Sequence, residues 1–435
     1  MVYLLYDLIL CLTGLVLIPC YAVRGLVRGK ARQGIRERFG LFAPGRLDAL
    51  RGRSVIWLHA VSVGETRAAI PLVKTLRQAY PDAALVLSSV TETGREIALG
   101  IKEVDVTLFF PVDLSWVVRR VLSLVRPELV LIVETELWPQ FIRHCHRRHI
   151  PVVLVNGRIS DRSFPRYRKV RRLLKPLMHQ VCGFCMQSEL DARRIAELGA
   201  PPQRIQVTGN LKFDLDATQL PVETPQQLRT EFGLDDAVPI WVAGSTHEGE
   251  EERIVAVYQT LIAQGRKLLL ILVPRHPHRV RQVTAHLDAQ GLSWRLRSAP
   301  VEQTLQSGQV LVVDTIGEML KFYRLAEVVF VGGSLVPVGG HNVLEASLLQ
   351  KPVLFGPFMH NFREIAAWVE KAQGFGRIED DEALLRLMCQ LFDQPTLRQQ
   401  AGQDGWKLLQ RHAGASRRTL DALRPWLSLP PAGGA

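Results

Sequence analysis

A glycine-rich stretch near residue 340 contains the residues best suited to hold a ligand. Val331–Glu345 (Val-Gly-Gly-Ser-Leu-Val-Pro-Val-Gly-Gly-His-Asn-Val-Leu-Glu) predicts a buried strand, a tight turn and the start of a helix that carries a carboxylate. Glycine lets the backbone approach a ligand closely, and the N–H groups at a helix start favour an anion such as phosphate. Glu345 can accept two hydrogen bonds from a vicinal diol such as that of a ribose. The pattern indicates a nucleotide or nucleotide-sugar site, although a strand–helix turn without a ligand fits it equally well.

Two carboxylates in the first half of the chain follow predicted strands. In His59–Glu65 a glycine precedes Glu65 at the opening of a helix, and Glu134 comes directly after the apolar run Leu129–Val133. Glu65 fits a general base, and it fits a helix-capping residue slightly better, because the helix dipole stabilises a carboxylate there. Glu134 can orient or stabilise a reacting group, whereas Glu136 is interpreted as a cap of the following helix.

Cationic and polar residues follow several other predicted strands. Lys212 precedes a polar stretch and can offset phosphate charge, although a surface lysine is the simpler interpretation. Arg275, between two prolines, can pair with a phosphate. The second half contains no G-x-x-x-x-G-K-[ST] pattern, which argues against a P-loop NTPase. Together with the glycine-rich stretch, three further loops in the second half indicate a nucleotide site: Gly244–Glu250, Pro274–Pro277 and Asp314–Met319.

These residues require parallel sheets to position them. Apolar strand-like runs alternate with amphipathic helical runs, which is typical of βαβ units buried on both faces. In the first half, strands are predicted at Ser54–Val61, Ala84–Val90, Val106–Pro111, Glu128–Val133, Pro151–Asn156, Val181–Met186 and Ile205–Thr208. In the second half, they are predicted at Ile240–Ala243, Leu268–Val273, Val310–Val313, Val328–Val331 and Val353–Phe355. Ligands of such sheets bind beyond the carboxyl ends of the strands, and two such domains on one linker indicate a cleft between them.

The N-terminus predicts a membrane anchor. Residues 3–23 are almost entirely apolar and long enough to span a bilayer, and six basic residues follow between Arg24 and Arg38. By the positive-inside rule, the domains after the anchor lie on the cytoplasmic side. A cleaved signal peptide is disfavoured because its charges would precede the apolar core. Asp7 leaves open whether the segment spans the membrane or lies in one leaflet. The expected division is therefore 1–30 anchor and basic flank, 31–215 first domain, 216–227 linker, 228–428 second domain and 429–435 tail.

The composition of the chain indicates the class of partner that the protein binds. The chain of 435 residues is 47% hydrophobic and 22% charged, with a net charge of +12, which suits a globular protein with a polyanionic partner. Arg162–Lys175 predicts one basic amphipathic helix for an anionic membrane surface, with a solvated helix face as a close alternative and nucleic acid as a third. Six cysteines without regular disulfide spacing indicate a reducing compartment. Cys182 and Cys185, and the run His144–His149, are interpreted as structural and not as metal ligands.

Seven motifs in order along the chain resemble those of the 3-deoxy-D-manno-octulosonic acid (Kdo) transferases of lipopolysaccharide synthesis. They are Leu58–Glu65, Glu134–Pro139, Gly209–Asp214, Gly244–Glu250, Pro274–Pro277, Asp314–Glu318 and Gly339–Glu345. The resemblance implies a GT-B glycosyltransferase with two Rossmann-like domains, CMP-Kdo as donor, the lipid A precursor lipid IVA as acceptor, and no required metal or cofactor. It also implies an inner-membrane location and no nucleic-acid partner, and it leaves the oligomeric state and the number of Kdo residues transferred open.

The same resemblance implies roles for individual residues. Glu65 is the general base, and Glu134 and Lys212 stabilise the transition state. The residues that match CMP-contacting segments are Pro274, Arg275, Ile316, Gly317, Glu318, Asn342, Val343, Leu344 and Glu345. Two alternatives stay open: a membrane-anchored GT-B transferase that uses another nucleotide sugar, and a membrane-tethered binding protein with a degenerate nucleotide fold.

Overall fold

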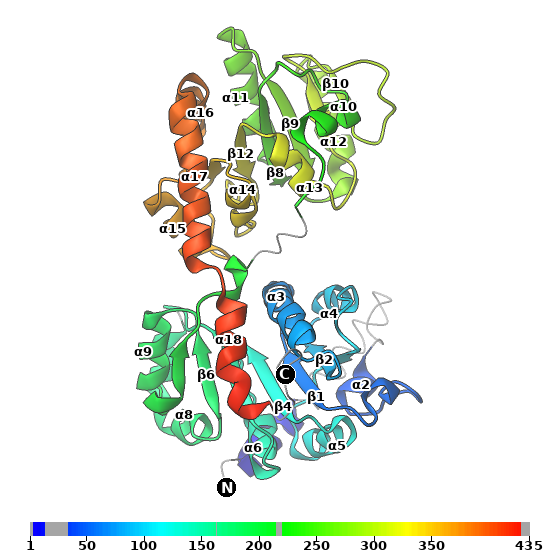
Figure 1. The fold of residues 1–435 in the computed structure, drawn as a ribbon, viewed down its shortest axis with the longest axis vertical. Helices are drawn as coiled ribbons and strands as arrows, with labels where there is room; N and C mark the ends of the chain where they lie inside the picture. The colour runs from blue at the N-terminus through cyan, green and yellow to red at the C-terminus, as the bar shows by residue number, and fades with distance from the viewer. Residues whose placement is uncertain (1–2, 14–33, 162, 215–219, 428–435) are drawn as a thin grey trace, which may run out of the picture. The chain divides into compact units, whose positions relative to one another are not determined.

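The computed structural model describes residues 3–13, 34–161, 163–214 and 220–427, which form two compact units (Figure 1). The first unit holds the described residues up to Asp214 together with those from Ala413 onward, and the second holds those between them. The sequence-based boundary at 428 differs from this division, because the last helix packs on the first unit and not on the second. The two parallel-sheet α/β domains expected from the sequence are confirmed.

The first unit is built on a parallel sheet whose seven described strands are ordered β3-β2-β1-β4-β5-β6-β7. The strands are β1 (Val55–His59), β2 (Ala84–Ser89), β3 (Val106–Phe109), β4 (Leu129–Val133), β5 (Val152–Gly157), β6 (Gly183–Met186) and β7 (Ile205–Val207). The order 3-2-1-4-5-6 is that of a Rossmann fold, so the carboxyl ends of β1 and β4 meet at the point where the winding direction reverses.

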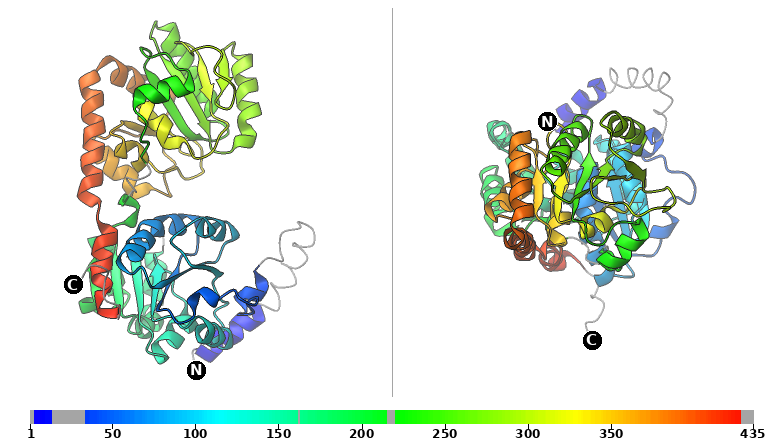
Figure 2. Two further views of the ribbon diagram at one scale, coloured as in Figure 1. Left: turned by 45° about the vertical axis from the view of Figure 1, so that its right-hand side comes forward. Right: turned by 90° about the horizontal axis from the view of Figure 1, so that it is seen from above.

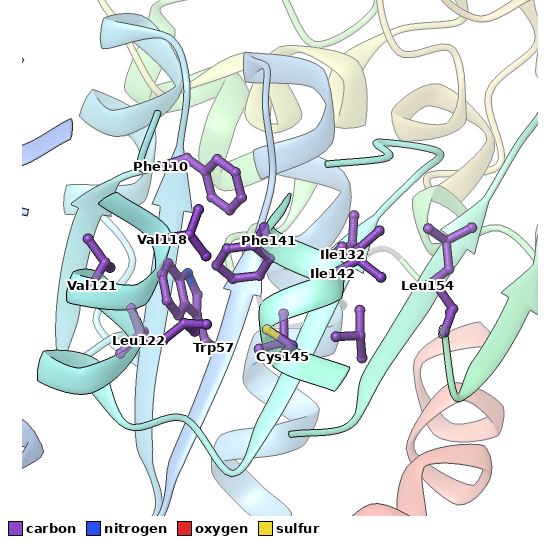
Figure 3. Close-up of a cluster of buried hydrophobic side chains, with 14 of the residues drawn as sticks. Trp57, Phe110, Val118, Val121, Leu122, Ile132, Phe141, Ile142, Cys145 and Leu154 are labelled. Atoms are coloured by element: carbon purple, nitrogen blue, oxygen red, sulfur yellow. The ribbon is translucent and has the colours of Figure 1, made fainter. Parts of the chain in front are cut away.

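Helices cover both faces of this sheet, which explains why its strands are continuously apolar. One face packs the cluster drawn in Figure 3, where Trp57 and Phe141 lie edge to face with ring centroids 5.1 Å apart. The helices are α2 (Ile35–Arg38), α3 (Val63–Ala79), α4 (Glu92–Leu99), α5 (Ser115–Val125), α6 (Pro139–Arg147), α7 (Phe164–Lys169), α8 (Arg171–Met178), α9 (Glu189–Glu197) and α18 (Ala415–Leu423), with 3₁₀ turns η1 (Asp48–Leu50), η2 (Pro202–Arg204), η3 (Leu211–Phe213) and η6 (Arg424–Trp426).

The second unit repeats the α/β architecture (Figure 2). Its six described parallel strands are in the order β10-β11-β9-β8-β12-β13. They are β8 (Ile240–Thr246), β9 (Leu269–Pro274), β10 (Trp294–Leu296), β11 (Val310–Val312), β12 (Val328–Val331) and β13 (Val353–Phe355). Its helices are α10 (Pro225–Phe232), α11 (Glu251–Ala263), α12 (Val280–Ala289), α13 (Met319–Leu325), α14 (Leu344–Leu348), α15 (Arg363–Lys371), α16 (Asp381–Asp393) and α17 (Pro395–His412), with the 3₁₀ turn η5 (Pro277–Arg279). The sequence did not predict β10, because this half-buried edge strand lacks an apolar run.

The chain leaves and re-enters the first unit at one point. The Asp214 carboxylate accepts the N–H groups of Gly414 at 2.6 Å, Ala415 at 3.1 Å and Ser416 at 2.5 Å, and so caps the start of α18. The α18 helix packs against α3 and η3, and Leu420 and Leu423 are buried there. This packing explains why residues after 412 belong to the first unit.

The N-terminal segment only partly falls within the described residues. Residues 3–13 are helical and pack on the first unit, where the Tyr6 hydroxyl donates to Asp113 at 3.0 Å and Asp7 accepts the N–H of Ser115 at 3.2 Å. The remainder of the predicted anchor and most of its basic flank lie outside the described residues. In the part of the chain that the structure describes, no helix has both the length and the apolar character needed to cross a membrane. The predicted anchor is therefore not confirmed.

The basic segment predicted as one helix over Arg162–Lys175 is two helices. α7 ends at Lys169, α8 begins at Arg171, and Val170 between them has φ −105° and ψ 16°. Residues 164–175 are all exposed or half-buried, so their charges face solvent to a large extent.

Candidate functional site

The three predicted catalytic residues lie beyond the carboxyl ends of strands in the first sheet. Glu65 follows β1 on α3, Glu134 follows β4, and Lys212 follows β7 in η3. The η3 turn packs against α3, and Leu211 of that turn donates its N–H to the Asn156 side chain at 3.0 Å. The fold thus places all three residues at the edge where parallel sheets bind ligands. Their catalytic roles stay predictions.

Glu65 is held by hydrogen bonds on both carboxylate oxygens. Oε2 accepts the N–H of Val61 at 2.8 Å, and Oε1 accepts the Ser62 hydroxyl at 2.8 Å. Ser62 is the N-cap of α3 and accepts the N–H of Glu65 at 3.3 Å. Burial raises the pKa of Glu65 to about 7; the charges of Glu134 and Glu136 add to the rise, and the bonds from Val61 and Ser62 oppose it. A carboxylate with a pKa near neutrality and a fixed orientation suits a general base.

Glu134 lies in a backbone conformation that favours glycine. Its φ is +60°, in the left-handed region, and its N–H donates to Val155 O at 2.9 Å. A non-glycine residue in this region costs of order 1–3 kcal/mol, and such strain clusters at functional sites. Glu136 does not cap the next helix as predicted, because the N-cap of α6 is Trp138 and no side chain caps it. Burial and the charge of Glu134 raise the pKa of Glu136.

His59 belongs to the same motif as Glu65 but cannot act as a second base. It is fully buried at the end of β1, and its ring stacks on Phe110 with centroids 3.7 Å apart. Nδ1 lies 3.0 Å from the Ser88 hydroxyl. Burial lowers the pKa of His59 to about 3, so the ring is neutral at physiological pH. The sequence carried no signal for this burial beyond the apolar residues around the histidine.

In the second unit, Pro274 ends β9 and Arg275 follows it on the surface. The N–H of Arg275 donates to Thr246 O at 2.9 Å, which fixes this turn against the end of β8. Four residues further on, the buried Arg279 forms an ion pair with Glu251 at 2.7 Å. Arg275 and Arg279 therefore differ in role. Arg275 is exposed at the carboxyl ends of the strands, whereas Arg279 is buried in an ion pair within the unit.

Glu250 organises the glycine-rich stretch, and sequence reasoning missed it. The side chain is fully buried, and Oε2 accepts the N–H groups of His247 at 2.9 Å and Gly333 at 2.7 Å. Oε1 accepts those of Ser334 at 2.9 Å and Leu335 at 2.8 Å. One carboxylate thereby shapes the turns after both β8 and β12. An acidic residue directly after a glycine in a strand-end loop was the available signal.

The other predicted CMP-contacting residues lie in two loops. Ile316 is 84% exposed, Gly317 has φ +91°, and Glu318 pairs with Arg297 at 3.0 Å. The helix predicted after the glycine-rich turn is short, because α14 spans only Leu344–Leu348. Such a short helix has a weak dipole, so the expected helix-start anion site loses most of its basis. Asn342, Val343, Leu344 and Glu345 nevertheless follow the glycine-rich turn as predicted; the Asn342 amide donates to Glu345 at 3.3 Å.

Two histidines join the turns after β8 and β12. The rings of His247 and His341 stack at 8° with centroids 5.2 Å apart, and their Nε2 atoms are 2.9 Å apart. One nitrogen must donate and the other accept, so the two facing nitrogens cannot both carry a proton. Burial, followed by the charges of His276, Arg275 and Arg279, lowers the pKa of His247.

The fold and these loops define a class of protein. A solved glycosyltransferase from Rickettsia africae superposes with a TM-score of 0.58 over 87% of this chain and 99% of that chain, at 13% identity. At that identity the likeness concerns the fold alone. The two parallel-sheet units, with polar loops at their carboxyl edges, thus resemble GT-B glycosyltransferases.

Sequence relatives narrow the class to a family. A family model described as 3-deoxy-D-manno-octulosonic-acid transferase (kdotransferase) matches residues 33–215. A 3-deoxy-D-manno-octulosonic acid transferase of Haemophilus influenzae is 35% identical over 97% of this chain and 96% of its own. One from Bordetella pertussis is 33% identical over 89% of this chain and 92% of its own. The chain belongs to the 3-deoxy-D-manno-octulosonic acid transferase family, and the family resemblance expected from the sequence is confirmed.

Proposed function

We propose that this protein transfers Kdo from CMP-Kdo to a hydroxyl of lipid IVA with inversion of configuration and without a metal. The observation that carries the proposal is the Glu65 carboxylate, with its pKa near 7, at the carboxyl edge of the first sheet in a member of this family. Glu65 takes the proton of the acceptor hydroxyl, whose oxygen forms the new bond to the anomeric carbon of Kdo. The bond from that carbon to the CMP phosphate oxygen breaks with its electron pair.

Preorganised cations are expected to stabilise the departing CMP phosphate. Arg275 at the end of β9 and Lys212 in η3 are the proposed cations, and the turn after β12 is the proposed ribose and phosphate contact. The net charge of +12 supports a phosphorylated acceptor at an anionic membrane surface. We place the protein at the cytoplasmic face of the inner membrane on the basis of the apolar residues 3–23 and the basic flank that follows them.

The test is CMP release from CMP-Kdo by the purified full chain in detergent, with and without lipid IVA. Lipid-dependent release, matched by an acceptor mass gain of one or more Kdo units, is the expected result, and the mass counts the additions. Folded protein that releases no CMP under these conditions overturns the donor assignment. Equal activity in the presence of a metal chelator is expected as well.

A further inference from the structure

A basic cavity lies beside the edge strand of the first sheet. The segment 34–46 runs along β3: Glu37 accepts the N–H of Phe109 at 2.9 Å, and the Arg46 guanidinium donates to Thr107 O. The cavity next to this segment has a volume of about 490 Å³. That size lies within the range of about 300–1,000 Å³ typical of small-molecule sites.

The lining of the cavity combines positive charge with an apolar wall. Its charged residues are Arg36, Arg46, Arg95 and Glu37, and its apolar wall includes Leu41 and Phe42. The lining thus holds three guanidinium groups and one carboxylate, and that carboxylate already accepts the N–H of Phe109. The chemistry therefore favours an anion attached to an apolar body over a free soluble anion.

Two of the three arginines are held in place by the protein. The Arg46 guanidinium is fixed by its bond to Thr107 O. Arg95 lies over the Phe109 ring at 4.6 Å and 3.5 Å from the Glu37 carboxylate. Each of these contacts uses only some of the five N–H donors of a guanidinium, whose planar fork matches the oxygens of a phosphate.

A short chain of hydrogen bonds connects this cavity to Glu65. Arg95 lies on α4, whose N-cap Thr91 donates through its hydroxyl to Val61 O at 3.3 Å; Ser89 donates to the same oxygen at 3.0 Å. The N–H of Val61 in turn donates to Glu65. In the strand order β3-β2-β1, the edge strand and the strand before Glu65 are two spacings apart, roughly 10 Å. A headgroup held in the cavity has to extend at least that far to bring a hydroxyl to Glu65.

We propose that this cavity binds a phosphate of the acceptor's lipid headgroup and so selects which hydroxyl faces Glu65. The inference rests on the proposed function, because it takes the acceptor to be a phosphorylated glycolipid. Arg36, Arg46 and Arg95 hold the phosphate, and Leu41 and Phe42 contact the apolar part of the lipid.

The experiment measures binding of the bisphosphorylated acceptor in detergent micelles, and separately its KM and kcat at saturating donor. We expect Arg36→Gln, at an exposed position, to weaken acceptor binding and raise its KM about tenfold, the effect of losing one charge-assisted contact, with kcat unchanged. Arg95→Lys keeps the charge but loses the fork, and we expect a smaller rise in KM. The acceptor stripped of its phosphates should bind wild type and Arg36→Gln equally.

Arg51→Gln is the matched control, because Arg51 is an exposed arginine in the same part of the chain and does not line the cavity. An equal loss in Arg51→Gln, or an equal loss with the dephosphorylated acceptor, overturns the proposal. So does a wild-type protein that binds both acceptors alike, whether or not it transfers Kdo. Binding to phosphatidylglycerol vesicles tests whether the cavity recognises membrane lipid in general and not the acceptor. If Arg36→Gln weakens vesicle binding but leaves acceptor binding unchanged, the cavity binds the membrane surface and the proposal fails. Failure of transfer with intact acceptor binding overturns only the proposed function.

Discussion

Glu65→Gln is the change that tests the proposed chemistry most directly. The amide is nearly isosteric, and its oxygen can replace one of the two carboxylate acceptors that now bind Val61 N–H and the Ser62 hydroxyl. It cannot accept the acceptor's proton. Loss of a general base lowers the rate by about 10²–10⁴. We therefore expect CMP-Kdo binding to persist in calorimetry while kcat falls by roughly that factor.

The pH profile provides a second, independent readout. Because burial raises the pKa of Glu65 to about 7, the base is about half ionised at neutrality and mostly ionised above it. One titrating group with that pKa gives roughly a tenth of the plateau kcat at pH 6 and about nine tenths at pH 8. Ser62→Ala removes a bond that lowers this pKa, so it should move the rise in kcat to higher pH. Glu134→Gln removes a charge that raises the pKa, so it should move the rise to lower pH as well as slow the reaction.

Asp191 provides the matched control. At the start of α9, Ser188 donates to Asp191 at 2.5 Å, and Asp191 also accepts the N–H of Ile159 at 2.8 Å. Asp191→Asn therefore perturbs the same kind of cap as Glu65→Gln, and we expect it to lower stability without lowering kcat. If Glu65→Gln keeps normal turnover, or if both variants lose activity in proportion to stability, Glu65 is a cap and not the base.

Three further predictions concern the buried Glu250, the protonation of His247 and the packing of the N-terminal segment. Glu250→Gln places an amide N–H₂ group among N–H donors, so it should lower the free energy of unfolding by about 3 kcal/mol in urea, whereas the exposed Glu252→Gln should leave it unchanged. Because burial lowers its pKa, His247 should titrate below pH 6.5 in NMR spectra of the folded protein and near 6.5 in urea. Tyr6→Phe removes the hydrogen bond to Asp113 and should cost about 1 kcal/mol of stability, measured by the same urea titration; unchanged stability would show that the segment 3–13 does not pack as described.

The sequence predicts the parallel strands well, because strands buried on both faces are continuously apolar. Val328–Val331 and Val353–Phe355 match β12 and β13 residue for residue, and other strand ends differ by a few positions. The edge strand β10 escaped prediction because its residues are only half-buried. The return of α18 to the first unit was also missed, because nothing local distinguishes a helix that packs on one sheet from a helix that packs on another.

Part of the candidate site could likewise be predicted from the sequence, and part could not. Residues directly after strands, such as Glu65 and Glu134, could be found from the pattern, because parallel topology brings strand ends to one edge. The N–H bonds that Glu250 accepts from Gly333, Ser334 and Leu335 could not, because they join turns more than eighty residues apart. The left-handed φ of Glu134 was equally hidden, since only the folded backbone reveals strain.

Comparison of Glu65 with Asp191 shows what singles out a catalytic carboxylate. Both stand three residues after an N-cap serine, and both accept that serine's hydroxyl. Each also accepts one main-chain N–H, which Glu65 takes from Val61 in its own loop and Asp191 from Ile159 in a neighbouring loop. A carboxylate that caps a helix in this way is therefore not by itself a sign of catalysis. At Glu65, burial raises the pKa, and the charges of Glu134 and Glu136, on the loop after the adjacent strand β4, add to that rise. Clustered like charges oppose folding, and perturbed pKa values of this origin gather at functional sites. The case for Glu65 as the base thus rests on its neighbours and not on the cap it shares with Asp191.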